Sequence, residues 1–156
     1  MIKAETMIII HLLHAMATWG MVGIIWFVQL VHYPLFCYVP WEGFGRFSLA
    51  YQHRTSFVIV PLMLAELVTS VLIACHPPVH LLPCLGIVLL GGIWSSTFLI
   101  QVPLHKRLAL GFHPIIHRRL VRTNWLRTIL WSVRGALAIV LLFEALSQLS
   151  PPIELN

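Results

Sequence analysis

Four long apolar runs constrain this chain more than any other feature of its sequence. An α-helix rises ~1.5 Å per residue, so about 20 apolar residues cross a hydrocarbon core of ~30 Å. A helix also satisfies its own backbone hydrogen bonds, as a segment surrounded by lipid must. The sequence therefore predicts an all-α integral membrane protein, a four-helix bundle that forms a single transmembrane domain over residues 1–156. Its expected spans are residues 7–31, 55–75, 81–102 and 124–147.

The composition excludes a soluble domain. Charged residues make up only 10% of the chain and hydrophobic residues 59%, whereas roughly 25% of the residues of an average soluble domain are charged. The first run is not a cleaved signal sequence, because it exceeds the roughly 7–15 apolar residues of such signals and no small-residue cleavage site follows it. We therefore expect the first run to stay in the membrane.

Lysine and arginine concentrate in two of the three segments that connect the runs. By the positive-inside rule these two long connections are cytoplasmic, and both termini lie on the opposite side. The expected location is a bacterial inner membrane, with membrane lipids as partners. The net charge of +5 thus reports topology, and no nucleic-acid partner is expected. The basic residues of the two connections are Arg46, Arg54, Lys106, Arg107, Arg118, Arg119 and Arg122.

Both long connections carry helix signals of their own. In the first, Phe44, Phe47 and Tyr51 follow at steps of three and four, which predicts an interfacial helix that runs into the second span. Pro61 should bend that span, since a proline inside a helix removes a backbone donor. In the second connection Pro114 is a suitable first helical residue, so we expect a helix that starts there and continues into the fourth span.

The third connection is the short turn HPPVH, which Cys75 and Cys84 flank. These two cysteines could form a disulfide in an oxidising compartment, or they could be small apolar residues at helix ends. The remaining cysteine, Cys37, lies in the first long connection. The three cysteines do not form a metal-binding motif.

Two charges lie at the same depth in different spans. Glu66 is ~16 Å from the cytoplasmic end of the second span, and Arg134 is ~15 Å from that end of the fourth span, at helical rise. An unpaired charge at this depth is very unfavourable, so the two should form a structural buried pair. Asn124, Arg127, Trp131 and Arg134 follow at steps of three, four and three, which places them on one helix face. That face should look into the bundle.

Further polar residues gather near the cytoplasmic boundary of every span. Such a convergence of imidazoles, amides and guanidiniums at one depth is typical of a ligand or metal site. We predict His53, His105 and Arg127 as catalytic residues, with His53 and His105 binding metal or relaying protons and Arg127 holding a substrate oxygen or anion. The predicted ligand-binding residues are Gln29, Gln101, Asn124 and Trp131.

The predicted metal ligands are His32, His53 and His105, since three spans bring them to the same side. Neutral imidazole suits Fe, Cu or Zn. A carboxylate-rich di-iron bundle is not supported, because it needs several glutamates with Glu-x-x-His spacing. Three alternatives stay open: one Fe or Cu ion, a haem held by two histidines, or no metal. We expect the histidines of the turn, His76 and His80, to be interfacial anchors rather than ligands.

The last third of the chain resembles the anthrone oxygenase-like (DUF1772) family of small four-helix membrane proteins. The resemblance lies in VPLHKRL at residues 102–108 and TNWLR at residues 123–127, with His105 where the family more often has asparagine. Family members are associated with oxygenation of polycyclic anthrones. The resemblance implies that the site is lined by Pro103, His105, Arg107, Asn124 and Arg127.

The leading functional hypothesis is a membrane-embedded oxidoreductase or oxygenase-like protein. Its cytoplasmic-side polar pocket would take a lipophilic aromatic or quinone-like ligand, above a floor set by Glu66 and Arg134. The alternative is a non-catalytic accessory subunit of a respiratory or photosynthetic membrane complex, or a homo-oligomer, that contacts lipid, pigment or protein through its six tryptophans. Transport is less favoured, because four spans without inverted repeats make a poor carrier.

Overall fold

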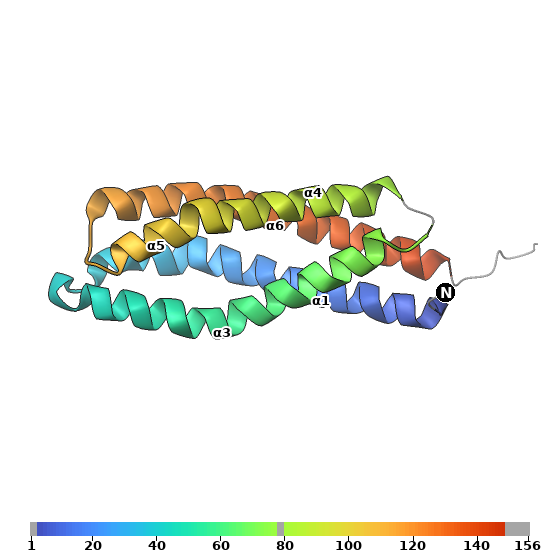
Figure 1. Ribbon diagram of the computed structural model, residues 1–156, viewed down its shortest axis with the longest axis horizontal. Helices are drawn as coiled ribbons and strands as arrows, with labels where there is room; N and C mark the ends of the chain where they lie inside the picture. The colour runs from blue at the N-terminus through green and yellow to red at the C-terminus, as the bar shows by residue number, and fades with distance from the viewer. Residues whose placement is uncertain (1–2, 78–79, 149–156) are drawn as a thin grey trace, which may run out of the picture.

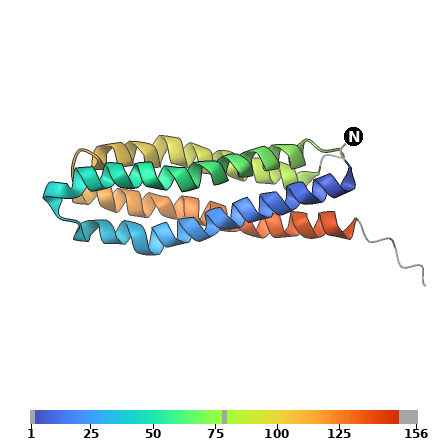
Figure 2. The ribbon, with the colours of Figure 1, turned by 90° about the horizontal axis from the view of Figure 1, so that it is seen from below.

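The computed structural model describes residues 3–77 and 80–148, and the regular elements of these residues are all helical. Four helical columns run antiparallel in one elongated bundle (Figures 1 and 2). Each column is long and apolar enough to cross a membrane. The chain thus has the all-helical architecture and the four membrane-length helices that its apolar runs predict.

The first and third columns are each divided into several segments. The first comprises α1 (Ala4–Phe27), η1 (Val28–His32), α2 (Tyr33–Leu35) and η2 (Phe36–Tyr38). The second is the single helix α3 (Trp41–Ala74). The third comprises α4 (Leu81–Ser96), η3 (Thr97–Gln101) and α5 (Val102–Leu108). The fourth is the single helix α6 (Pro114–Ser147).

The two ends of the bundle differ. The start of α1, the end of α3, the start of α4 and the end of α6 lie together at one end, which we call the turn end (Figure 1). The connections from η2 to α3 and from α5 to α6 lie at the other, which we call the loop end. Along the bundle α1 packs against both α3 and α6, and α4 packs against α6.

The connections at the loop end are shorter than the sequence suggests. Only Val39–Pro40 and the residues 109–113 lack regular helix there. Residues 41–53, expected as an interfacial helix that runs into the second span, form one continuous helix with it. Pro61 lies inside this helix, and Figure 1 shows α3 changing direction about midway. The fourth helix begins at Pro114, as predicted. The three cysteines are free and exposed.

Two prolines account for the division of the first and third columns. Pro34 and Pro103 each follow a five-residue π-helical segment, η1 and η3 respectively. A proline has no N–H to donate, and its ring collides with the carbonyl four residues earlier, so the helix widens just before it. Each widening changes which residues face inward beyond it. Gln29 and Gln101 lie inside the two widened segments and are both buried.

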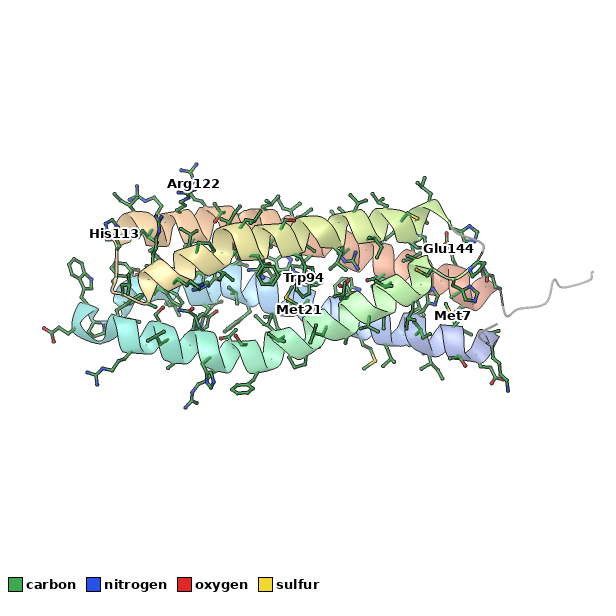
Figure 3. All side chains as sticks on the ribbon, in the orientation of Figure 1. Met7, Met21, Trp94, His113, Arg122 and Glu144 are labelled. Atoms are coloured by element: carbon green, nitrogen blue, oxygen red, sulfur yellow. The ribbon has the colours of Figure 1, made fainter. Side chains whose placement is uncertain are left out.

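The middle of the bundle is closed by apolar side chains, which we call the apolar layer. In Figure 3 Met21 and Trp94 lie midway along the bundle. The buried members of the layer are Met21, Val22, Ile25, Met63, Ile93 and Trp131. A second buried cluster, rich in aromatic rings, fills the loop end around Tyr33, Phe36 and Phe44. The outer surface is also apolar, with exposed side chains such as Phe57, Val88, Leu99 and Phe143, as helices facing lipid require.

Candidate functional site

Polar side chains inside the bundle form two groups, one on each side of the apolar layer. The group toward the loop end, the arginine site, consists of Arg127, His32, Tyr33, Tyr51 and His105. The group toward the turn end, the ion-pair cluster, consists of Glu66, Ser70 and Arg134. Both groups meet the same inward face of α6, where Asn124, Arg127, Trp131 and Arg134 are all buried, as the spacing predicted.

The ion-pair cluster joins three helices. Arg134 Nη2 donates to Glu66 Oε1 of α3 and, at 2.8 Å, to Ser70 Oγ on the same helix. Arg134 Nη1 donates to the carbonyl of Gly86 on α4. The contact between Glu66 and Arg134 that their equal depths predicted is therefore confirmed. A buried charge with an opposite partner and further hydrogen bonds is well compensated.

Arg127 has no such compensation. Its side chain is 5% exposed, and no carboxylate of residues 3–77 and 80–148 lies within salt-bridge distance of it. Its Nη1 donates to Asn124 Oδ1 at 3.2 Å, while its Nε has no hydrogen-bond partner in the part of the chain that the structure describes. The guanidinium lies beside the phenol groups of Tyr33 and Tyr51. We expected Arg127 near the cytoplasmic boundary of the fourth span, and its side chain is buried inside the bundle.

A chain of amides orients Arg127. The backbone carbonyl of Val121 accepts from Gln29 Nε2 at 3.3 Å, and Gln29 Oε1 accepts from Asn124 Nδ2 at 2.9 Å. Asn124 Oδ1 is then left to accept from Arg127. The direction of every bond in this chain follows from the carbonyl at its start, since a carbonyl can only accept. Gln29 and Asn124 therefore position the arginine.

The other two predicted ligand residues have different surroundings. Gln101 Nε2 donates to Thr123 Oγ1 at 3.1 Å, and the Gln101 side-chain oxygen is buried without a partner. Trp131 is fully buried within the apolar layer, and its indole N–H has no partner among the described residues. Gln101 thus lies at the edge of the arginine site, whereas Trp131 separates that site from the ion-pair cluster.

A hydrogen-bonded acid–base pair lies next to Arg127. The Tyr33 hydroxyl and His105 Nε2 are 2.8 Å apart, and His105 Nδ1 is buried without a partner among residues 3–77 and 80–148. A tyrosine hydroxyl can donate or accept, and so can the imidazole nitrogen, depending on its tautomer. The Tyr33 carbonyl in turn lies 2.7 Å from His117 Nε2, which ties this segment to α6. The pair can therefore hold a proton in either of two positions.

The three predicted metal ligands do not come together. His53 is exposed on α3, where its ring packs edge-on against Phe57. His32 instead stacks on Tyr51 with ring centroids 4.3 Å apart, and its Nε2 is buried without a partner. Within the described part of the chain, no group of three or more His, Cys, Asp or Glu side chains is placed to hold a metal. A three-histidine metal site does not fit this arrangement.

The sequence reasoning missed both tyrosines of the arginine site. Tyr33 directly precedes Pro34, and a proline that widens a helix is a signal that an adjacent side chain is redirected. Tyr51 was recognised as part of a helical stripe, but the stripe was assigned to the membrane interface. His117, which the helix predicted from Pro114 includes, lies in α6 and stacks on Phe36.

Comparison with known proteins adds no relative: no family model, no curated protein and no solved structure matches this chain. The resemblance of VPLHKRL and TNWLR to the anthrone oxygenase-like family therefore stays a hypothesis. Two residues that it implies, Asn124 and Arg127, are in direct contact. A third, His105, belongs to the same site through Tyr33.

Proposed function

We propose that this protein is a membrane-embedded oxidoreductase or oxygenase-like protein that binds a lipophilic aromatic or quinone-like molecule at the arginine site. The observation that carries the proposal is the buried guanidinium of Arg127, which has no carboxylate partner among the described residues. A charge inside a membrane bundle is costly, and such residues usually mark a functional site. An oxygen atom of a bound ligand would complete the hydrogen bonding of Arg127.

The neighbours of Arg127 match the other needs of such a ligand. The Tyr33–His105 pair can give a proton to a quinone-type oxygen or take one from a phenolic oxygen, which is general acid–base chemistry. The stacked rings of His32 and Tyr51 form an aromatic surface of the kind that favours a flat ring. Arg127 stabilises negative charge on the oxygen while the proton moves.

The orientation follows from the distribution of positive charge. The protein lies in a bacterial inner membrane. Its loop end is cytoplasmic, because that end carries seven of the ten lysines and arginines, and both termini lie on the opposite side of the membrane. The first part of α3, residues 41–53, lies at the membrane interface, where its exposed Trp41 is a suitable anchor. The arginine site then opens toward the cytoplasmic leaflet.

The binding of a short-chain ubiquinone by the protein in lipid nanodiscs tests the proposal. Quinones quench tryptophan fluorescence, so specific binding gives a saturable component above the linear quenching due to partitioning. Replacing Arg127 by Gln should weaken the saturable component by at least about tenfold, the effect of losing a hydrogen bond to a charged group. The matched control is Arg122→Gln on the exposed side of the same helix, which should bind as the unmodified protein does.

Two results would reject the proposal. One is the absence of any saturable quenching, and the other is equal quenching in the Arg127 and Arg122 variants. If the protein, colourless and without ligand, were then recovered from native membranes only with partner subunits, the accessory-subunit alternative would replace the enzyme.

A further inference from the structure

The turn end of the bundle is hollow. A groove of about 870 Å³ lies between α1, α3 and α6, lined among others by Met7, His11 and His76. These three residues also line an adjoining cavity of about 290 Å³, which reaches His80 and Glu144. Figure 3 shows Met7 and Glu144 at this end of the bundle. Three histidines and a glutamate from separate parts of the chain therefore surround one opening.

The hollow continues inward to the ion-pair cluster. Ile73, Pro83 and Leu141 line the 290 Å³ cavity and also a smaller one of about 10 Å³. The smaller cavity lies against His14 and Arg134. A cavity of roughly 10–15 Å³ holds one water molecule when polar groups surround it. The two cavities therefore adjoin, and only the side chains that line both lie between the opening at the turn end and the cavity beside Arg134.

The ion-pair cluster contains polar atoms that need such a water. Glu66 Oε2 and Arg134 Nε are buried and have no hydrogen-bond partner among the described residues. A buried polar atom without a partner lowers stability by about 1–3 kcal/mol, and more if it is charged. Water that reaches the cluster would satisfy these atoms, because it can both donate and accept.

The hydrogen bonds of His14 determine its tautomer. The Thr69 hydroxyl donates to the carbonyl of Ala65 at 2.8 Å, so its oxygen is free only to accept. His14 Nδ1 lies 3.1 Å from that oxygen and must therefore carry the imidazole proton. The other nitrogen, Nε2, then keeps its lone pair, and the His14 side chain lines the small cavity. The titratable groups around His14 are His11 on its own helix, Glu66 on α3 and Arg134 on α6.

We propose that the turn end forms an aqueous vestibule that brings water and protons to His14 and the ion-pair cluster. A hydrated proton that enters transfers its proton to His14 Nε2 and leaves a water molecule, which gives an imidazolium with both nitrogens protonated. The apolar layer, with Met21, Ile93 and Trp131 fully or almost fully buried, ends the vestibule before the arginine site. This proposal stands on the turn end alone and does not depend on the ligand of the arginine site.

Cysteine accessibility tests the vestibule. In a background with Cys37, Cys75 and Cys84 changed to serine, Ile73→Cys and Leu141→Cys are introduced singly and exposed to a charged, membrane-impermeant thiol reagent in nanodiscs. Both should react at least about tenfold faster than Ile93→Cys in the apolar layer, because a thiol in a dry layer reacts only after local opening. Met21→Cys is a second control from the apolar layer. Circular dichroism shows whether each variant is folded.

Nuclear magnetic resonance of ¹⁵N-labelled histidine tests the proton acceptor, with the His14 signals assigned by their loss in His14→Gln. At neutral pH the His14 signals should show a protonated Nδ1 and an unprotonated Nε2, and acid should move Nε2 reversibly to the protonated position. The proposal is overturned if Ile73→Cys and Leu141→Cys react as slowly as Ile93→Cys. It is also overturned if the His14 signals stay unchanged by acid until the protein unfolds.

Discussion

Arg127 and Arg134 lie two turns apart on the same face of α6, both are buried, and only Arg134 has a carboxylate partner among residues 3–77 and 80–148. The same chemical group thus occurs in one helix in a compensated and in an uncompensated state. To hold its helices together, a fold needs only the compensated arginine. The difference between the two arginines separates a contact that joins helices from the side chain at which we propose that a ligand binds.

The ion pair should be a large contributor to stability. Glu66→Gln or Arg134→Gln alone should lower the free energy of unfolding by about 3–5 kcal/mol, the usual effect of leaving one buried charge without its partner. Combining the two changes should recover much of the loss. Unfolding in mixed micelles of a mild detergent and sodium dodecyl sulfate measures the free energy of unfolding of each variant. A loss in the double variant equal to the sum of the two single losses would contradict the pairing.

Arg127 should behave in the opposite way. Arg127→Met removes a buried charge that has no counter-ion, so the free energy of unfolding should stay the same or increase. Binding of a short-chain quinone should be lost in the same variant. Arg134→Met, measured in the same way, should instead lower the free energy of unfolding. Equal destabilisation by Arg127→Met and Arg134→Met would show that Arg127 is a structural residue.

His105 should matter and His53 should not. His105→Leu removes the partner of a buried tyrosine hydroxyl and should lower stability by about 1–3 kcal/mol as well as weaken quinone binding. His53 is exposed, so His53→Ala should leave both quantities unchanged. The pairing is tested by a double-mutant cycle of His105→Leu with Tyr33→Phe, in which the two losses should overlap rather than add.

Pro103 should set the direction of His105. Pro103→Ala restores a backbone donor and allows η3 to return to α-helical geometry, which rotates all residues that follow. The contact between His105 and Tyr33 should then be lost, together with quinone binding, even though helix content is unchanged or higher. Histidine signals in the magnetic resonance spectrum report the loss, and an unchanged His105 signal would show that packing alone maintains the widened segment.

The topology prediction is independent of the site. A reporter enzyme fused after residue 156 should be active outside the cytoplasm, because seven basic residues lie in the helix ends at the loop end of the bundle. A reporter within residues 109–113 should be active inside. The opposite pattern would place the arginine site in the outer leaflet and leave its geometry untouched.

Run lengths and depths in the sequence were enough to predict the four helices and the contact between Glu66 and Arg134. Both depend on simple quantities, namely the rise of a helix and the cost of a buried charge. The inward face of α6 followed from the same helical spacing. These features needed no knowledge of the neighbouring helices.

The other residues of the arginine site could be predicted only if the inward face of α3 were known. Tyr51 and His53 are two residues apart and therefore lie on opposite sides of the helix. The spacing of Phe44, Phe47 and Tyr51 shows that they share a face, but lipid and a bundle interior are equally apolar. Periodicity therefore could not tell the two apart. The widened segments η1 and η3, before Pro34 and Pro103, also change which residues of the first and third columns face the centre of the bundle.

The length of α6 has a consequence for how a ligand reaches the protein. Its 34 residues extend ~51 Å at helical rise, well beyond a hydrocarbon core of ~30 Å, and the ten residues before Asn124 include Arg118, Arg119 and Arg122. Arg127 is then close to the plane where acyl chains meet headgroups. A ligand with an apolar tail could reach that plane by lateral diffusion without passing through water. Occupancy of the site would follow the mole fraction of the ligand among the lipids, so diluting the protein with buffer would leave it unchanged and adding lipid would lower it.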